Sequence, residues 1–371
     1  MKSPLIGLQE YGQSIWLDTI SRELIASGDF RRLVEEDNVH GVTSNPTIFD
    51  KAIEGSSDYD PSLSALLAAD PAASTPALLE KLEIQDIQMA ADILRPVYDR
   101  TSGADGFASI EVSPRLAHDA AGSIAEARRL RAAVNRTNLM IKIPATDEGI
   151  DAVETLTAEG ININITLMFS QTHYEKVAQA YLRGLERNAQ PNQVVSVASF
   201  FISRVDTEVD RALQTIGTPD ALSLCGKIGI ANAKLIYRRF QEIFLGAAFA
   251  KFKTRGANVQ RPLWASTGTK NPAYSDVLYI EELIGPHTIN TMPLSTLRAF
   301  RDHGRPAATL ETAVQQAEGA LLRLAGLGIE LAPVTEKLLE DGLSAFLASL
   351  SQLQAAVEEK RKSLSSSRKI A

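Results

Sequence analysis

A lysine stands in the middle of an apolar segment, in the run Leu-Met-Ile-Lys-Ile-Pro at residues 139–144. With the period of two of a β-strand, Lys142 points to the opposite side from Ile141 and Ile143. Lysine is almost never fully buried without a partner, so this position calls for an explanation. Burial disfavours the charged form of an amine and lowers its pKa, and a neutral amine can attack a ketone to form an imine. The segment therefore predicts covalent chemistry on a carbonyl substrate.

Polar side chains recur on one face of other short apolar segments. Residues 161–167 read Ile-Asn-Ile-Asn-Ile-Thr-Leu, so Asn162, Asn164 and Thr166 share one face of a strand and the isoleucines share the other. Parallel strands are usually runs of Val, Ile and Leu. We therefore infer that the isoleucines pack on outer helices and that the polar set points into a barrel, towards the carboxyl ends of the strands. Six strands would end in inward polar residues, namely Asp18, Asn45, Glu111, Lys142, Thr166 and Ser199.

These residues have the types that imine chemistry needs. A protonated imine draws electrons from a neighbouring C–C bond, and cleavage of that bond needs a proton shuttle. Asp18 and Glu111 supply two carboxyl groups for it, while Asn45, Asn164 and Ser199 supply hydrogen bonds for the hydroxyls of a polyol. Taken alone, Asp18 is equally well explained as the cap of the helix that follows it.

Arg204 follows the sixth candidate strand, in the sequence SFFISRVD. A guanidinium at the mouth of a barrel can bind a phosphate group through two parallel hydrogen bonds. The alternative is a surface ion pair with Asp206 or Glu208, and the local sequence does not separate the two.

The sequence predicts no metal ion and no organic cofactor. Its five histidines are scattered, without the spacing of metal ligands, and no CxxC pair is present. Walker A and GxSxG motifs are missing, and no GxGxxG turn follows the first candidate strand. The one cysteine, Cys225, lies in an apolar setting and is predicted to be a buried structural thiol, which fits a reducing compartment.

Short apolar segments alternate with segments of helical periodicity, which predicts parallel strands joined by helical crossovers. Eight such units favour an α/β fold of the closed (β/α)8 TIM-barrel type. The candidate strands are residues 14–18, 40–45, 107–112, 139–144, 163–167, 194–199, 262–266 and 287–293. We predict a single domain over residues 1–371, with helical insertions at about 46–106 and 200–261 and C-terminal helices at about 307–362. An apolar stripe from Leu339 to Val357 predicts that the last helix packs on the barrel.

Composition excludes several classes of protein. The 371 residues are 44% hydrophobic and 22% charged, as in ordinary globular proteins. A net charge of −7 argues against a general nucleic-acid binder. The N-terminal segment lacks the continuous apolar region of a signal peptide, and no stretch approaches the roughly 20 apolar residues that span a bilayer. We therefore expect a soluble, cytoplasmic protein that binds neither nucleic acid nor membrane, while its oligomeric state is not determined by the sequence.

Five segments resemble the transaldolases in order and spacing, and the chain length resembles the longer bacterial branch of that family. The segments are GVTSNPTIF (41–49), SIEVSPRLA (109–117), LMIKIPAT (139–146), GININITLMFS (160–170) and SFFISRVD (199–206). The resemblance implies a class I aldolase-type barrel without a cofactor. It also implies reversible transfer of a dihydroxyacetone unit from sedoheptulose 7-phosphate to glyceraldehyde 3-phosphate. The products would be erythrose 4-phosphate and fructose 6-phosphate, in the non-oxidative pentose phosphate pathway.

The same resemblance implies roles for single residues. Lys142 matches the Schiff-base lysine, and Asp18 matches the acid/base that assists C–C cleavage. Glu111 and Thr166 match the pair that positions a catalytic water. The residues that match contacts to substrate hydroxyls or phosphate are Thr43, Asn45, Asn164, Ser199, Phe201, Arg204 and Ser266.

The seventh strand departs from the pattern of the shorter transaldolases. They have Ala-Ser-x-Arg there, whereas this chain reads Ala-Ser-Thr-Gly-Thr-Lys at residues 265–270. Ser266 matches and the arginine does not, so we predict that Lys270 reaches the phosphate instead.

Two rival functions remain open at this point. Fructose 6-phosphate aldolases have the same lysine but release free dihydroxyacetone; they resemble shorter chains and have glutamine in place of Glu111. A non-catalytic barrel that serves as a binding protein is the other rival, although such a protein gains nothing from a buried lysine.

Overall fold

The computed structural model describes residues 3–367. Eight parallel strands close into a barrel in chain order, with the last strand paired to the first. Their bounds are β1 Gln13–Leu17, β2 Val39–Val42, β3 Phe107–Glu111, β4 Leu139–Pro144, β5 Ile163–Met168, β6 Ser196–Phe201, β7 Gln260–Ala265 and β8 Thr288–Met292. The predicted (β/α)8 barrel is confirmed, and each candidate strand lies within three residues of its predicted ends.

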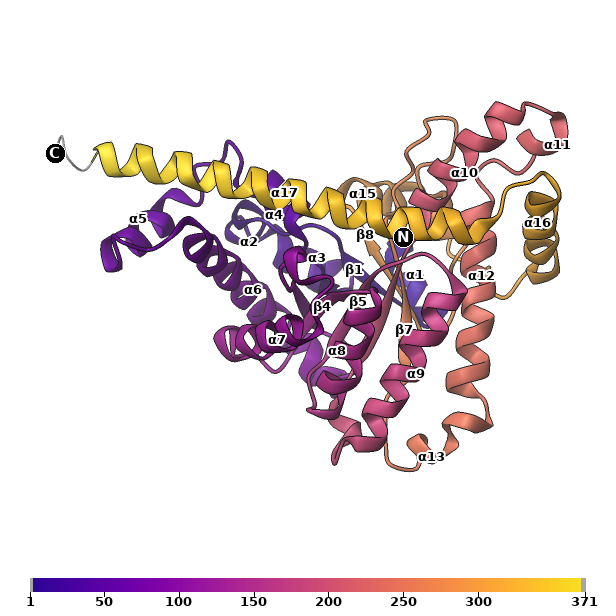
Figure 1. Ribbon diagram of the computed structural model, residues 1–371, viewed down its shortest axis with the longest axis horizontal. Coiled ribbons are helices and arrows are strands. Elements are labelled where there is room, and N and C mark those ends of the chain that lie inside the picture. Colours follow the sequence, from indigo (N-terminus) through magenta and orange to yellow (C-terminus); the bar gives the residue numbers. More distant parts are fainter. Residues whose placement is uncertain (1–2, 368–371) are drawn as a thin grey trace.

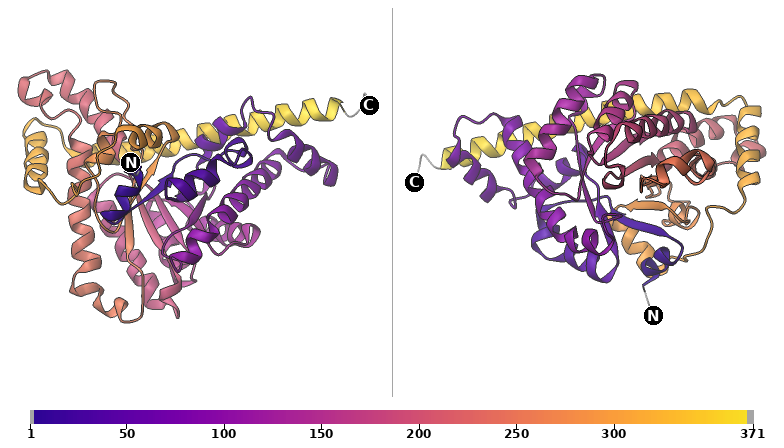
Figure 2. Two further views of the ribbon diagram at one scale, coloured as in Figure 1. Left: turned by 180° about the vertical axis from the view of Figure 1, so that it is seen from behind. Right: turned by 90° about the horizontal axis from the view of Figure 1, so that it is seen from below.

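Helices surround the barrel, and both predicted insertions are helical (Figures 1 and 2). The β2–β3 connection contains α4 (Pro46–Ile53), α5 (Asp60–Ala69) and α6 (Thr75–Arg100). The β6–β7 connection contains α10 (Ile202–Ile216), α11 (Pro219–Leu222), α12 (Ile228–Phe240) and α13 (Ala250–Lys253). The remaining α-helices are α1 Pro4–Glu10, α2 Arg22–Ala26, α3 Asp29–Glu36, α7 Ala120–Val134, α8 Asp147–Ala158, α9 Gln171–Arg187, α14 Leu278–Glu281, α15 Leu294–His303, α16 Val314–Gly326 and α17 Leu331–Ser367. That these elements form a single domain stays a prediction. Within residues 3–367, no helix combines the length and apolar character needed to cross a membrane.

The last helix, α17, runs along the carboxyl end of the barrel and extends beyond it alongside α5 (Figure 1). It packs against α4, α6, α10 and β5. The predicted apolar stripe faces inward, since Leu339, Leu343, Phe346, Leu353 and Val357 are all buried. The helix therefore packs on the barrel as expected.

Alternation along the strands sorts their side chains into two layers. Ile141, Ile143, Ile163 and Ile165 belong to the apolar cluster between the sheet and the outer helices, as predicted. A separate cluster fills the inside of the barrel towards the amino ends of the strands and includes Phe107, Met140, Val197 and Ile289. This packed lower layer leaves the polar inner positions at the carboxyl ends of the strands as the place where a ligand can enter.

A glycine makes room for the largest side chain of the lower layer. The indole of Trp16 lies against Gly41 on the neighbouring strand, where a Cβ atom would come within 2.4 Å of the ring. Any larger residue at position 41 would push the indole out of the barrel interior, because interiors are close-packed.

A buried carboxylate joins the amino ends of several strands. Asp105, just before β3, accepts hydrogen bonds from Trp16 Nε1 at 2.8 Å and from the Ser14 hydroxyl. One of its oxygens lies 3.6 Å from His40 Nδ1 and 3.7 Å from Arg261 Nη1. Burial alone would raise the pKa of Asp105, but Arg261, His40 and Ser14 outweigh burial and hold that pKa below its ordinary value.

We predict that Asp105→Ala lowers the free energy of unfolding by about 3–5 kcal/mol. The reason is that Arg261 loses its buried counter-charge and the Trp16 N–H loses its hydrogen-bond acceptor. A folded-state pKa below the unfolded one gives stability that is present above the unfolded pKa and is lost as the pH falls through the folded pKa. Urea unfolding of the wild type should therefore weaken below about pH 4, and Asp105→Asn should lack this part of the pH dependence. An unfolding free energy unchanged in Asp105→Ala would contradict this account.

Candidate active site

Three inward side chains lie at the same level on neighbouring strands. Strand register pairs Glu111 with Lys142 and Lys142 with Asn164, and residues paired in this way point to the same face of the sheet. Lys142 Nζ is 3.2 Å from Glu111 Oε2 and donates a hydrogen bond of 3.1 Å to the Ser44 carbonyl oxygen. The lysine side chain is 3% exposed and the glutamate side chain 5%. The lysine is thus buried, as predicted, and its partner is a carboxylate.

Asp18 lies beside this pair, directly after β1. The Thr43 hydroxyl donates to Asp18 Oδ1 at 2.7 Å, and Thr43 Oγ1 is 3.0 Å from Thr291 Oγ1. Burial raises the pKa of Asp18, although the charge of Lys142 and the Thr43 hydrogen bond lower it in part. Asp18 is not a helix cap, because Ser21 caps α2. Of the two explanations, helix cap and acid/base group, the surroundings of Asp18 favour the acid/base group.

The second carboxyl group has a similar environment. Burial raises the pKa of Glu111, and the opposing charge of Lys142 lowers it in part. Both carboxyls thus take up a proton closer to neutral pH than an exposed carboxyl does, which suits groups that must accept and return protons during a reaction.

A hydrogen-bonded chain continues around the barrel on the other side of Lys142. The Ser199 hydroxyl donates to Asn164 Oδ1 at 2.6 Å, and Asn164 Nδ2 donates to Ser109 Oγ at 3.2 Å. These two bonds fix the orientation of the Asn164 amide inside the barrel.

The expectation that Asn162 shares this site is wrong. It precedes β5, where its amide donates to the Leu139 carbonyl and accepts from the Val195 N–H. It therefore joins the amino ends of adjacent strands rather than facing a ligand.

Two buried oxygens near the lysine have no hydrogen-bond partner among residues 3–367. They are Thr166 Oγ1 and Glu111 Oε2, the latter facing the Lys142 ammonium as an ion pair. Buried polar atoms are nearly always satisfied, by water where protein offers no partner, so these atoms are suited to hold a water molecule or a substrate oxygen. The residue after Thr166, Leu167, has a φ of +59°, an unfavourable conformation for a leucine that is found where structure is shaped by function.

The substrate-sized opening is a cavity of about 520 Å³ at the carboxyl end of the barrel. Its lining includes Asp18, Asn45, Phe201, Arg204, Ser266, Lys270 and Phe346. Asn45 caps α4, since its side-chain oxygen accepts from the Ile48 N–H at 3.0 Å, which leaves its amide nitrogen to donate. Ser266, with a φ of +53°, has its hydroxyl 2.9 Å from the Ser203 hydroxyl.

The cavity lining combines the cations Lys51, Arg204 and Lys270 with the carboxylates Asp18, Glu23 and Asp58. The Arg204 guanidinium carbon lies 4.8 Å from the centroid of the Phe201 ring. Within the described chain, neither Arg204 nor Lys270 has a carboxylate within 4.0 Å, so the ion-pair alternative for Arg204 is wrong. Glu208 instead pairs with Arg211 and Lys337, and Asp206 accepts from the Gly229 N–H. Cations in a polar cavity that are not engaged in a direct ion pair favour an anionic ligand such as a phosphate.

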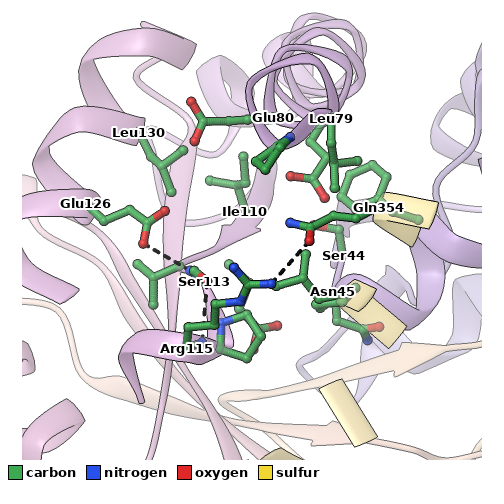
Figure 3. A pocket seen from close by; sticks show the side chains of 18 residues that line it. Ser44, Asn45, Leu79, Glu80, Ile110, Ser113, Arg115, Glu126, Leu130 and Gln354 are labelled. Atoms are coloured by element: carbon green, nitrogen blue, oxygen red, sulfur yellow. Dashed lines mark hydrogen bonds between the residues drawn. The ribbon is translucent and has the colours of Figure 1, made fainter. Parts of the chain in front are cut away.

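A smaller cavity of about 170 Å³ is lined by Glu111 and shares Asn45 with the first cavity; Figure 3 shows its lining. Arg115 donates across this space to Gln354 of α17 at 3.2 Å. Burial, together with neighbouring acidic groups, raises the pKa of Glu83 in its wall to about 8. A carboxyl with this pKa is largely protonated at neutral pH, so Glu83 places no full negative charge in this wall.

Several residues contribute to the site without having been predicted from the sequence. Ser109 and Thr291 are in the inward phase of β3 and β8, so the alternation that identified Lys142 contains a signal for both. Ser44 contributes its backbone carbonyl, for which a sequence carries no signal. Phe346 was predicted only as a packing residue, but its ring centroid is 5.8 Å from Lys142 Nζ.

Cysteine and metal-ligand side chains are not part of this site. Cys225 is only partly buried, in the region of α11 and α12, and does not line the cavity. Residues 3–367 contain no group of three or more His, Cys, Asp or Glu side chains arranged to hold a metal ion.

The family model for transaldolase and fructose-6-phosphate aldolase matches residues 15–357, nearly the whole chain. The chain belongs to this family. A transaldolase of Thiobacillus denitrificans is 47% identical over 350 residues, which are 93% of this chain and 97% of the relative. A transaldolase of Acidothermus cellulolyticus is 47% identical over 362 residues, or 96% of each chain. One of Mycobacterium ulcerans is 44% identical over 363 residues, covering 96% of this chain and 97% of the relative. The resemblance inferred from the five motifs is thereby confirmed.

We predict that Asp18→Asn removes activity yet stabilises the fold. A group whose folded-state pKa is raised contributes stability that is present below the unfolded pKa and lost as the pH rises through the folded pKa. The charged Asp18 therefore costs stability at higher pH, and the neutral amide does not. We expect a gain on the order of 1 kcal/mol at pH 8 and a smaller gain at pH 5, measured by urea unfolding.

Asp151→Asn, at an exposed position on α8, serves as the control and should show no such pH trend. A gain of equal size at both pH values would refute this explanation.

Proposed function

We propose that the protein is a transaldolase that carries a dihydroxyacetone unit as an imine on Lys142. The observation that supports this most directly is the buried Lys142–Glu111 pair, which interacts with Asp18 in the wall of a cavity that Arg204 and Lys270 also line. Family membership and the relatives named transaldolase support the same activity.

Imine formation begins with a proton transfer within the ion pair. Glu111 takes a proton from the Lys142 ammonium, and the neutral amine attacks the carbonyl carbon of a ketose phosphate. The resulting carbinolamine loses its hydroxyl as water, with the proton returned by Glu111. Thr166 Oγ1 and Glu111 Oε2, two of the buried oxygens without hydrogen-bond partners among residues 3–367, are suited to hold that water.

Bond cleavage then uses the imine as the electron sink. Asp18 takes the proton of the hydroxyl next to the breaking C–C bond, the electron pair of the bond moves towards the protonated imine, and an aldose phosphate leaves. The three-carbon unit remains on Lys142 as an enamine. Attack of the enamine on a second aldehyde reverses these steps, and addition of water to the new imine frees the product.

Substrate recognition follows the distribution of polar groups. We assign Asn45, Asn164 and Ser199 to substrate hydroxyls, with Thr43 orienting Asp18. Arg204, Lys270 and Ser266 are assigned to the phosphate group, and Phe201 to the wall beside Arg204. The substrates would be sedoheptulose 7-phosphate and glyceraldehyde 3-phosphate, which give erythrose 4-phosphate and fructose 6-phosphate in the non-oxidative pentose phosphate pathway. The unpaired cysteine fits a cytoplasmic location.

Aldolase activity with release of free dihydroxyacetone is the nearest alternative, because the family model includes both activities. Glu111 favours transfer, since the aldolases have glutamine at that position and the relatives at 44–47% identity are named transaldolases. A non-catalytic barrel is disfavoured because it would have to bury Lys142, Glu111 and Asp18 without use.

We predict that borohydride reduction in the presence of fructose 6-phosphate traps a sugar adduct on the peptide that contains Lys142. Lys142→Met should form no adduct and lose transfer activity by at least about 10⁴-fold, because the covalent route is removed. Lys234→Met is the matched control. Lys234 is also buried, at 4% exposure, but it pairs with Glu282 outside the cavity. An adduct on any other lysine would refute the assignment; peptide mass spectrometry after proteolysis decides.

We predict that Lys270→Ala raises the KM for fructose 6-phosphate about tenfold and leaves kcat/KM for unphosphorylated fructose unchanged, since only the phosphate contact is lost. Lys253→Ala, at an exposed position on α13, should change neither. Steady-state kinetics with both sugars tests this, and an unchanged KM for fructose 6-phosphate removes Lys270 from the site.

A further inference from the structure

The first half of α17 closes the top of the barrel. Leu338, Leu339, Leu343 and Phe346 are buried in the same apolar cluster as the residues that fill the barrel interior. The second half belongs elsewhere, because Leu353 and Val357 lie in the cluster between the sheet and the outer helices. One helix thus packs against both layers, and its first half lies over the catalytic end (Figure 1).

A glycine lets this helix come close to the site. At Gly342 a Cβ atom would lie 2.8 Å from Leu167 Cδ2 and 3.4 Å from Arg204 Nη1. Leu167 follows Thr166 directly, so α17 touches the strand end that carries one catalytic candidate and the arginine assigned to phosphate. The helix is therefore held in place by the same residues that form the site.

One turn later, the helix presents an aromatic ring to the lysine. Phe346 is 1% exposed, lines the same cavity as Asp18 and Arg204, and has its ring centroid 5.8 Å from Lys142 Nζ. A ring face at this distance attracts a cation such as an ammonium or a protonated imine. It also offers no hydrogen-bond partner, so a water molecule on this side of Nζ would lack the polar contacts that hold buried water.

A proton donor such as water at the enamine carbon decides between two fates of the enamine, because both fates later end with water adding to an imine. In transfer, the enamine carbon attacks an acceptor aldehyde. In release, the enamine carbon takes a proton, water adds to the imine carbon, and the C–N bond breaks to give free dihydroxyacetone and the amine of Lys142. Excluding water from a closed site prevents such hydrolysis of a reactive intermediate.

We propose that Phe346 is the residue that shields the Lys142 intermediate from water, so that the three-carbon unit is transferred rather than released. This inference rests on the proposed function, because it requires an imine on Lys142. It assigns to the C-terminal helix a role in specificity, distinct from the roles of the strand residues that perform the chemistry.

The test compares Phe346→Ala and Phe346→Leu with the wild type, using fructose 6-phosphate with and without erythrose 4-phosphate. The quantity measured is the ratio of dihydroxyacetone released to sedoheptulose 7-phosphate formed. We expect this ratio to rise about tenfold in Phe346→Ala and less in Phe346→Leu, which keeps most of the bulk but loses the ring. Leu353→Ala is the matched control, since it removes a buried side chain from the same helix outside the cavity. It should lower the Tm without changing the ratio.

The outcomes separate this inference from the proposed function. If the wild type gives no borohydride adduct on Lys142, the proposed function fails. If the wild type and a folded Phe346 variant both give the adduct but the ratio stays at the wild-type value, only the shielding role is overturned. Should Phe346→Ala fail to fold, the ratio measured for Phe346→Leu decides. A rise of the same size in Leu353→Ala would also overturn the proposal, because the effect would then come from loosening the helix.

Discussion

The rest of the structure depends on one interaction, the contact of 3.2 Å between Lys142 and Glu111 inside the barrel. Removing two charges from water costs several kcal/mol for each ion unless geometry and further hydrogen bonds compensate. The closed barrel provides that geometry, because strand register places the two residues side by side, and the Ser44 carbonyl accepts one more lysine hydrogen. A carboxylate at this distance can take a proton from the ammonium, and an imine-forming amine requires such a partner.

The lower layer of the barrel stabilises the fold, and the upper layer carries the reactive groups. Packed apolar side chains and the Asp105 network close the amino ends, where no ligand needs to enter. The carboxyl ends carry groups that burial makes easier to protonate, such as Asp18, and cations such as Arg204 that have no carboxylate within 4.0 Å among the described residues. Features that are unfavourable for stability are thus concentrated where a substrate can satisfy them.

The sequence predicted those features that repeat along a strand and failed where a contact joins distant parts of the chain. Alternation of polar and apolar residues identified Lys142, Glu111 and Asn164, because period two fixes which side chains face inward. The same rule misplaced Asn162, because it cannot tell where a strand begins. The Ser44 contact uses a backbone atom, and the stripe on α17 predicted burial of Phe346 but not which atoms it would meet, since more than 200 positions separate it from Lys142. Substrate roles came from the family motifs, as local patterns cannot distinguish a phosphate contact from a surface ion pair.

The position of α17 in the chain bears on how the protein is made. Segments leave the ribosome in order and begin to fold as they emerge, so all eight strands are available before Leu331 appears. The amine and its carboxylate can therefore be assembled in an uncovered barrel, and the aromatic cover is added only after all eight strands have emerged. Mutations in α17 can alter the access of water to the carboxyl end of the barrel without disturbing strand pairing. Selection for a different reaction outcome could thus act on α17 while leaving the chemistry of the barrel intact.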